Sequence, residues 1–216
     1  MQLVLASNNA KKLVELGALF APVGVTLVRQ GELGVGEADE PHLTFLENAL
    51  AKARHAAAST GLPALADDSG LCVDALGGAP GVSSAHFAPL PDGPTAGALA
   101  GAAREGQRQR QDAANNALLL ERLQAVDDRR GCFCCTLVAI RAADDPQPLV
   151  ATGRWHGEIL RAPDGAGGFG YDPLVFIPAF GATVATLDAA LKNAHSHRAL
   201  AAAQMRALMR DAWRLG

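Results

Sequence analysis

Short apolar runs alternate along this chain with segments whose apolar residues recur at helical spacing, and this alternation constrains the fold most. Residues 1–6 form such a run, and residues 8–20 then place apolar side chains three and four positions apart. The same patterns predict strands at residues 25–30, 63–67, 132–141, 149–159 and 171–176, and helices at 44–60, 115–124 and 196–214. The mixture predicts an α/β fold.

The composition limits the classes of partner. The chain has 216 residues, of which 49% are hydrophobic, which is enough to fill a substantial core. Its 22 acidic and 19 basic side chains give a formal charge of −3 and no broad basic surface for nucleic acid. The sequence has no run of about 18 apolar residues and no secretory signal at its start. We therefore expect a cytoplasmic protein that binds neither nucleic acid nor membranes.

Two segments depart from the alternating pattern. Residues 88–111 are rich in Gly, Ala, Pro, Arg and Gln, which predicts a mobile surface insertion, with a helix at residues 98–105 as the alternative. Residues 165–170, GAGGFG, match the GxGxxG spacing of dinucleotide sites, but they lie late in the chain and precede a predicted strand. We expect a turn that places Phe169 near a ligand, and a dinucleotide site is the less favoured reading.

Two adjacent aspartates, Asp67 and Asp68, follow an apolar run and precede Ser69. Neighbouring carboxylates repel each other and are buried only near a cation or among many hydrogen bonds. Because side chains alternate along a strand, one aspartate would face a substrate pocket while the other holds the loop backbone. Mg²⁺ prefers carboxylate oxygens and bridges to phosphates. The pair therefore predicts a magnesium site, with an Asp-Ser-Gly turn as the alternative.

Residues 7–12, SNNAKK, lie where the first predicted strand meets the first helix. Free backbone N–H groups and the helix dipole favour anions there. Asn9 adds a neutral donor and Lys12 adds a positive charge. The segment therefore predicts either a polyphosphate site or an ordinary helix cap with surface lysines.

The helix expected to begin after Thr44 supplies further candidates. A Thr-x-x-Glu capping box marks its start, and Asn48 and Lys52 lie four residues apart, on one face. Glu40 ends an acidic loop just before this helix. Glu40 is a candidate metal ligand, with a solvated loop as the alternative. Asn48 and Lys52 share one helix face, for which a solvated face is the alternative to a functional one.

Positive charge also gathers at the start of the last predicted helix, where the helix dipole opposes it. An anion or a carbonyl-bearing ligand would relieve that conflict, and a structural role for the histidines is the alternative. The residues are Lys192, His195, His197 and Arg198.

Five motifs in order, SNNAKKLVE, TFLENALAKA, ADDSGLCVDALGGAPG, GGFGYDP and SHRA, closely resemble those of the inosine triphosphate pyrophosphatase family. The resemblance runs over about residues 2–205. It implies hydrolysis of ITP, dITP and XTP between the α and β phosphates, which releases the monophosphate and pyrophosphate. It also implies a magnesium-dependent homodimer, with an elongated mixed sheet flanked by helices in a single domain of two lobes and an active-site cleft between the lobes.

The resemblance also implies roles for individual residues. Asp68 would be the catalytic residue that activates water, and Glu40 and Asp68 would hold Mg²⁺. Residues 7–12 and Lys52 would bind the triphosphate, and the other residues would contact the rest of the substrate. The full substrate-binding set is Ser7, Asn8, Asn9, Ala10, Lys11, Lys12, Lys52, Ser69, Phe169, Gly170, Tyr171, Asp172, Lys192, His197 and Arg198.

Two positions depart from the family pattern: Ser83 replaces a tyrosine and His86 replaces an arginine. Both changes bear on dimer contacts or on the shape of the cleft, and neither touches the implied chemistry. Two other functions stay open. A pyrophosphatase for modified pyrimidine nucleotides should lack SHRA, and a non-catalytic nucleotide-binding protein would not need a carboxylate that orients water.

Overall fold

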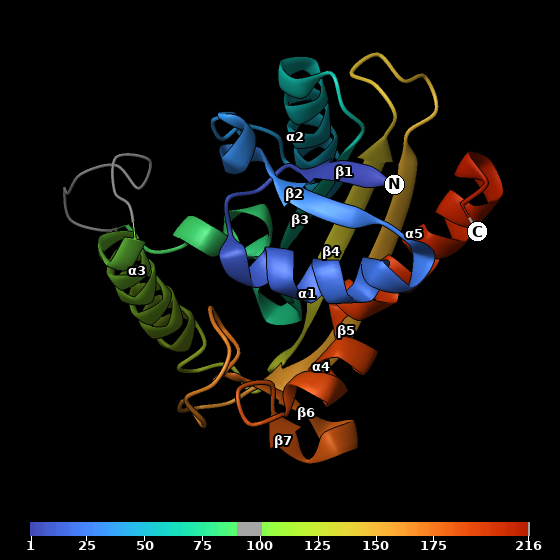
Figure 1. Cartoon of the computed structure of the whole chain (residues 1–216). Helices are drawn as coiled ribbons and strands as arrows, with labels where there is room; N and C mark the ends of the chain where they lie inside the picture. Colours follow the sequence, from blue (N-terminus) through green and yellow to red (C-terminus); the bar gives the residue numbers. More distant parts are fainter. Residues whose placement is uncertain (90–100, 216) are drawn as a thin grey trace. The chain divides into compact units, whose positions relative to one another are not determined.

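A computed structural model describes residues 1–89 and 101–215 (Figure 1). Its strands are β1 (Gln2–Leu5), β2 (Thr26–Arg29), β3 (Ala64–Val73), β4 (Arg130–Ile140), β5 (Leu149–Ile159), β6 (Val175–Ile177) and β7 (Ala182–Thr183). Its α-helices are α1 (Ala10–Phe20), α2 (Phe45–Thr60), α3 (Gly101–Arg122), α4 (Ala189–His195) and α5 (His197–Trp213).

The strands of the described chain form a mixed sheet in the order β2-β1-β3-β4-β5-β6-β7. β1 pairs in parallel with both β2 and β3, whereas β6 is antiparallel to β5 and β7. The α/β class and the mixed sheet flanked by helices are therefore confirmed.

The chain divides into two compact units. Unit 1 comprises Met1–Ser69, Cys134–Arg154 and Asn193–Gly216, and unit 2 comprises Gly70–Phe133 and Trp155–Lys192. Strands β3, β4 and β5 contribute residues to both units. That the chain acts as one domain of two lobes stays a prediction.

In unit 1, helices cover both faces of the sheet (Figure 1). Side chains alternate along a strand, so Leu3 and Leu5 pack with α1 and α5, whereas Val4 and Ala6 pack with α2. The α2 side of this contact is made of small residues, which let the helix lie close to the sheet. They are Ala49, Ala53, Ala56 and Ala57.

Unit 2 has its own core, which contains Leu119 of α3 and Leu123, the residue that follows this helix. Residues 101–111 belong to this helix, so the insertion predicted over residues 88–111 is wrong for that part. Gln, Arg, Glu and Ala favour helix, and the biased composition hid this propensity. The alternative helix at residues 98–105 is correct for residues 101–105, and residues 90–100 lie outside the described chain.

Other predicted elements differ at their boundaries. β3 continues to Val73, so the aspartates lie within a strand and the alternative Asp-Ser-Gly turn is wrong. The strand predicted at residues 171–176 is only the short β6, which residues 170–174 precede as a turn, and the sequence did not predict α4 or β7. Residues 165–170 do not open a helix, which removes the structural context of a dinucleotide site.

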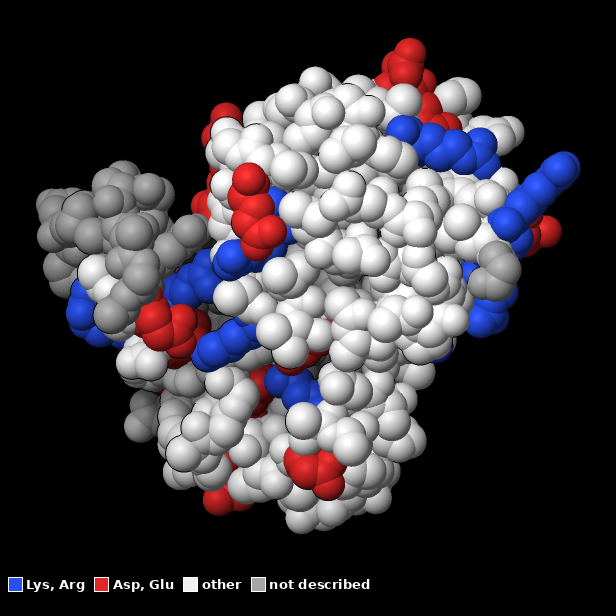
Figure 2. All heavy atoms as spheres, viewed as in Figure 1, with Lys and Arg blue, Asp and Glu red and all other residues white. Residues whose placement is uncertain are grey.

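The helices of the described chain include none that is both long and apolar enough to cross a membrane. On the face shown in Figure 2, Lys and Arg side chains are interspersed with Asp and Glu. This view therefore agrees with the near balance of acidic and basic residues in the sequence.

Candidate functional site

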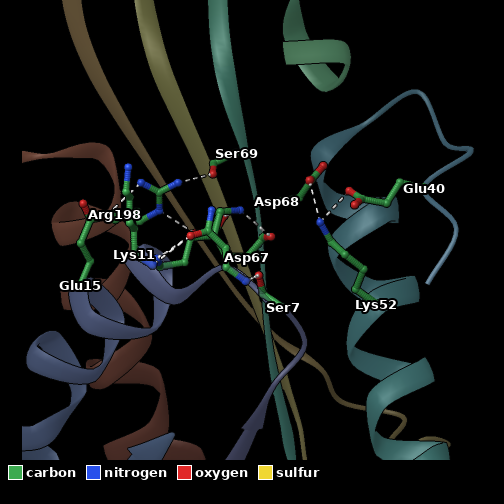
Figure 3. Close-up of polar contacts among 11 residues, drawn as sticks. Ser7, Lys11, Glu15, Glu40, Lys52, Asp67, Asp68, Ser69 and Arg198 are labelled. Atoms are coloured by element: carbon green, nitrogen blue, oxygen red, sulfur yellow. Dashed lines mark hydrogen bonds and ion pairs between the residues drawn. The ribbon is translucent and has the colours of Figure 1, made fainter. Parts of the chain in front are cut away.

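Asp67 and Asp68 lie in the middle of β3 and point away from each other (Figure 3). Their divergence follows from the alternation of side chains along a strand. Both are buried, since 0% of the Asp67 side chain and 9% of the Asp68 side chain are exposed. Each buried carboxylate therefore has to be paired with positive charge, and each is paired with basic side chains of unit 1.

Asp67 is held by two cations from two helices. Nε of Arg198, on α5, donates to Oδ2 over 2.7 Å, and Nζ of Lys12, on α1, donates to Oδ1 over 3.1 Å. Burial opposes ionisation of Asp67, but these two charges outweigh it and hold its pKa well below the usual range. Both aspartates lie within β3, so the prediction that one of them would hold a loop backbone is wrong.

Arg198 is a bridging residue with a side chain that is 5% exposed. Besides Asp67, it donates from Nη2 to Ser69 Oγ over 2.8 Å and from Nη1 to Glu15 Oε2 over 3.1 Å. Glu15 was not among the predicted site residues, although its position three residues after Lys12 places both on one helix face.

Asp68 is held by a different cation. Nζ of Lys52, on α2, donates to Asp68 Oδ1 over 2.8 Å and to Glu40 Oε2 over 2.7 Å (Figure 3). Burial raises the pKa of Asp68 to about 6 despite the charge of Lys52. Burial also opposes ionisation of Glu40, but Lys52 outweighs it and lowers the pKa of that carboxyl. The structure therefore brings Lys52, Glu40 and Asp68 together.

Glu40 and Asp68 fit a hard divalent cation. Oδ2 of Asp68 is buried and has no hydrogen-bond partner among the residues that the structure describes. Those residues contain no group of three or more His, Cys, Asp or Glu side chains able to hold a metal. Mg²⁺ does not need such a group, because it commonly uses one or two carboxylates and keeps several waters or phosphate oxygens.

These two clusters border a common pocket with about 360 Å³ of open space. Lys12 and Lys52 both reach it, although they come from different helices. Gln30 also lines it, and this residue is 2% exposed. The lining consists of Ala6, Ser7, Lys12, Gln30, Glu37, Ala38, Glu40, Lys52 and Asp67.

Two residues of this lining, Gln30 and Glu37, were not predicted from the sequence. Gln30 directly follows β2, and ligands of open α/β sheets bind beyond the carboxyl ends of parallel strands. That rule is the signal that would have indicated Gln30. Glu37 lies in the same acidic loop as Glu40, and the sequence offered no means of separating the two.

The start of α1 is a well-formed helix cap. Oδ1 of Asn9 accepts hydrogen bonds from the backbone N–H groups of Lys11 (3.0 Å) and Lys12 (3.3 Å). Oδ1 of Asn8 accepts from the N–H of Gly31 over 2.9 Å, which ties this segment to the end of β2. The helix cap is therefore confirmed, but Lys12 is not a surface lysine, since its side chain is 16% exposed and lines the pocket. Polyphosphate binding by this segment stays a prediction. Ser7 precedes the cap and Ala10 is the first residue of α1.

Asn48 has a structural role rather than a place in the pocket. Its Oδ1 accepts from the N–H of His42 over 3.0 Å, and its Nδ2 donates to the same residue's carbonyl oxygen over 3.2 Å. These bonds hold the loop between Glu40 and Thr44 against α2. Oγ1 of Thr44 accepts from the N–H of Glu47 over 3.2 Å, as a capping box requires.

Phe169–Asp172 form a turn in unit 2. Oδ2 of Asp172 accepts from the Phe169 N–H over 3.0 Å and from Lys192 Nζ over 2.9 Å. Nζ of Lys192 also lies 4.9 Å from the centre of the Phe169 ring, a cation–π distance. The Tyr171 hydroxyl donates to the Ser84 carbonyl oxygen over 3.0 Å. Of the two aromatic rings in this turn, that of Phe169 therefore has the Lys192 ammonium beside it.

The predicted cluster of cations at the start of the last helix is divided. A break at Ser196 separates α4 from α5, and the Ser196 side chain caps α5. Lys192 pairs with a carboxylate in unit 2, Arg198 pairs with carboxylates in unit 1, and His197 is buried. A ligand anion was expected to neutralise the charges of Lys192 and Arg198. Protein carboxylates already pair with both of these side chains.

Comparison with known proteins gives close relatives. The chain is 68% identical over 215 residues to a dITP/XTP pyrophosphatase of Leptothrix cholodnii, with 100% of both chains covered. It is 66% identical to one of Methylibium petroleiphilum, with 99% of both covered. A solved HAM1 protein from Coxiella burnetii has a TM-score of 0.81 and 42% identity, covering 97% of this chain and 98% of the other.

A second solved structure, the Ham1 protein of Staphylococcus aureus, has a TM-score of 0.79 and 31% identity over 97% of this chain and 98% of its own. The chain matches the Ham1 family over residues 3–208. These matches confirm the resemblance that the five motifs indicated and the fold that it implied. The chain belongs to the Ham1 family.

Proposed function

We propose that this chain hydrolyses non-canonical purine nucleoside triphosphates, namely ITP, dITP and XTP, to the monophosphate and pyrophosphate. The observation that carries the proposal is the pocket to which Lys12 and Lys52 both contribute, with Lys52 bound to Glu40 and Asp68. The proposal is supported by full-length relatives that are named dITP/XTP pyrophosphatase. This hydrolysis would remove such nucleotides from the nucleotide pool.

The triphosphate would bind along residues 7–12 and at Lys52. Negative charge spreads onto the leaving pyrophosphate during hydrolysis, and cations that are already in place stabilise it most effectively. Asp67 and Asp68 hold the two lysine ammonium groups at 3.1 and 2.8 Å, so neither has to be ordered when the substrate arrives. The short lysine–carboxylate bonds are thus the basis of preorganisation.

Glu40 and Asp68 would hold Mg²⁺, which when bound supplies positive charge to the phosphate oxygens. Asp68 would orient the attacking water and accept its proton. Without a metal, burial raises the pKa of this carboxyl to about 6, so it is still mostly ionised at neutral pH and can bind a cation. We give orientation more weight than proton transfer, because a metal-bound carboxylate is a weak base.

The purine base would pack on the turn Phe169–Asp172, next to Lys192 of the same unit, and His197 would take part in its recognition. Hypoxanthine and xanthine carry an oxygen at C6 that accepts hydrogen bonds, whereas adenine has an amino group there. Donors committed to that oxygen would be left without a partner by adenine, and such sites reject the wrong base strongly. Arg198 would support this recognition by holding Ser69, to which it donates over 2.8 Å.

The test is a comparison of substrates and products. The protein is incubated with Mg²⁺ and ITP, XTP, ATP, GTP or a modified pyrimidine nucleoside triphosphate, and pyrophosphate and orthophosphate are measured separately. We expect pyrophosphate from ITP and XTP and little product from ATP. Orthophosphate as the primary product, or a preference for the pyrimidine substrate, would contradict the proposal, and binding without turnover would favour a nucleotide-binding protein.

We also propose that the chain forms a homodimer. Ser83 and His86, the two positions that depart from the family pattern, are both exposed on the short helix Gly81–His86, where they are available to a partner subunit. Light scattering after size exclusion tests this directly: twice the chain mass is expected, and the mass of one chain contradicts it.

A further inference from the structure

Helix α3 holds the turn that carries Phe169 through two side chains. Oδ2 of Asp112 accepts a hydrogen bond from the Gly170 N–H over 2.8 Å. Nδ2 of Asn116 donates to the Gly170 carbonyl oxygen over 3.0 Å. Residues four apart lie on one face of a helix, so a single face of α3 binds both polar groups of one glycine.

These bonds restrict the residue beside the aromatic ring. Gly170 has a φ of +61°, a left-handed conformation that few other residues adopt easily. Its N–H belongs to the peptide that joins it to Phe169, so the bond to Asp112 fixes the orientation of that peptide. On the other side, the Phe169 N–H donates to Asp172 over 3.0 Å. Both peptides that flank Phe169 are therefore hydrogen-bonded to carboxylates.

Helix α3 is itself firmly anchored in unit 2. Asn115 is 2% exposed; it accepts from the Ala88 N–H over 2.8 Å and donates to the Ser84 carbonyl oxygen over 3.1 Å. One helical turn later, Leu119 is fully buried in the core of the unit. Asp112 and Asn116 thus extend from a rigid element, as groups that set the geometry of a binding site do.

We propose that Asp112 and Asn116 are positioning residues that hold the Phe169 turn in the conformation that binds the purine base. The inference rests on the proposed function, because it takes the turn as the surface on which the base packs. Neither residue takes part in the phosphate chemistry. Base contacts are made equally in the ground state and the transition state, so their loss raises KM and leaves kcat nearly unchanged.

The test compares three variants on α3 by pyrophosphate release from ITP. Asp112→Ala removes the acceptor of the Gly170 N–H, Asp112→Asn keeps an acceptor oxygen, and Gln109→Ala changes an exposed residue of the same helix as a control. We expect Asp112→Ala to raise KM about ten-fold, as loss of a charge-assisted hydrogen bond does, with kcat within about two-fold. Asp112→Asn should restore most of the affinity, and Gln109→Ala should match the wild type.

An unchanged KM in Asp112→Ala, or a loss confined to kcat, would overturn the inference. If that variant does not fold, Asn116→Ala takes its place, because it removes only a bond between neutral groups, and the same two outcomes decide. A wild-type protein that releases no pyrophosphate from ITP would refute the proposed function instead. In that case the affinity for inosine monophosphate is measured by calorimetry for the wild type and for Asp112→Ala. Weaker binding by the variant supports the inference, and equal binding overturns it.

Discussion

Nε of Arg198 donates to Oδ2 of Asp67 over 2.7 Å, with only 5% and 0% of the two side chains exposed. The bond joins the first turn of α5 to the middle of β3 in unit 1. A buried ion pair adds little net stability compared with apolar packing, but loss of one partner leaves a charge without compensation. Removal of either partner is therefore expected to lower the free energy of unfolding by more than the intact pair contributes to it.

Arg198→Ala should lower the free energy of unfolding by about 3–5 kcal/mol, because it leaves the Asp67 carboxylate buried with Lys12 as its remaining cation. Urea denaturation measures this change. Arg130→Ala is the control, since that arginine is 71% exposed in its pair with Asp128 and no measurable change is expected. Equal effects of the two substitutions would contradict the assigned role of Arg198.

The stability of the protein should depend on pH through Asp67. Lys12 and Arg198 outweigh burial and hold its pKa well below the ordinary value of 3.8, so the unfolded chain binds the proton more readily. The stabilisation is present above about pH 4 and is lost as the pH falls below that value. Chemical denaturation at several pH values measures it, and a free energy of unfolding that rises on acidification in this range would contradict the account.

Activity should depend on pH through Asp68. Burial raises its pKa to about 6, and the carboxyl must be ionised to hold a metal and to orient water. At low Mg²⁺, kcat/KM should therefore decrease as the pH falls below about 6. Protons and metal compete for the same oxygens, so higher Mg²⁺ should move the decrease to lower pH. A profile that Mg²⁺ does not shift would argue against Asp68 as a metal ligand.

Gly153 on β5 allows α5 to lie close to the sheet. A Cβ atom there would meet the carbonyl oxygen of His197 and would lie 2.7 Å from the backbone nitrogen of Ala201. Gly153→Ala should therefore displace the start of α5 and destabilise the protein by about 1–3 kcal/mol. Thermal unfolding tests this against Gly17→Ala in α1, where a Cβ meets nothing within 4 Å and about 1 kcal/mol of stabilisation is expected.

The strands and helices with strong periodicity could be predicted from the sequence. The strand over residues 149–159 was predicted with the boundaries of β5, and the capping box correctly marked the start of α2. The short β7 and α4 were missed, because a few residues that owe their conformation to packing carry no periodic signal. For residues 101–111 the biased composition predicted a mobile insertion, although it consists of good helix formers and only residues 98–105 were given helix as the alternative.

The site was predictable in its charges but not in their pairing. The sequence indicated Lys12, Lys52, Glu40 and the two aspartates, yet nothing in it shows that Lys52 contacts both Glu40 and Asp68. Arg198 was expected to face a ligand, whereas three protein groups accept its hydrogen bonds. The bonds of Arg198 join residues more than 100 positions apart, whereas Lys52 lies 12 and 16 positions from its two partners. In both cases only the fold brings the partners together.

The central claim is that Asp68 is the catalytic carboxylate of a pyrophosphatase, and initial rates of pyrophosphate release from ITP test it most directly. Asp68→Asn is compared with the wild type and with Asp128→Asn, which changes a surface aspartate that is 45% exposed. We predict near-complete loss of pyrophosphate release in Asp68→Asn and wild-type rates in Asp128→Asn. Wild-type rates in a folded Asp68→Asn protein would contradict the claim.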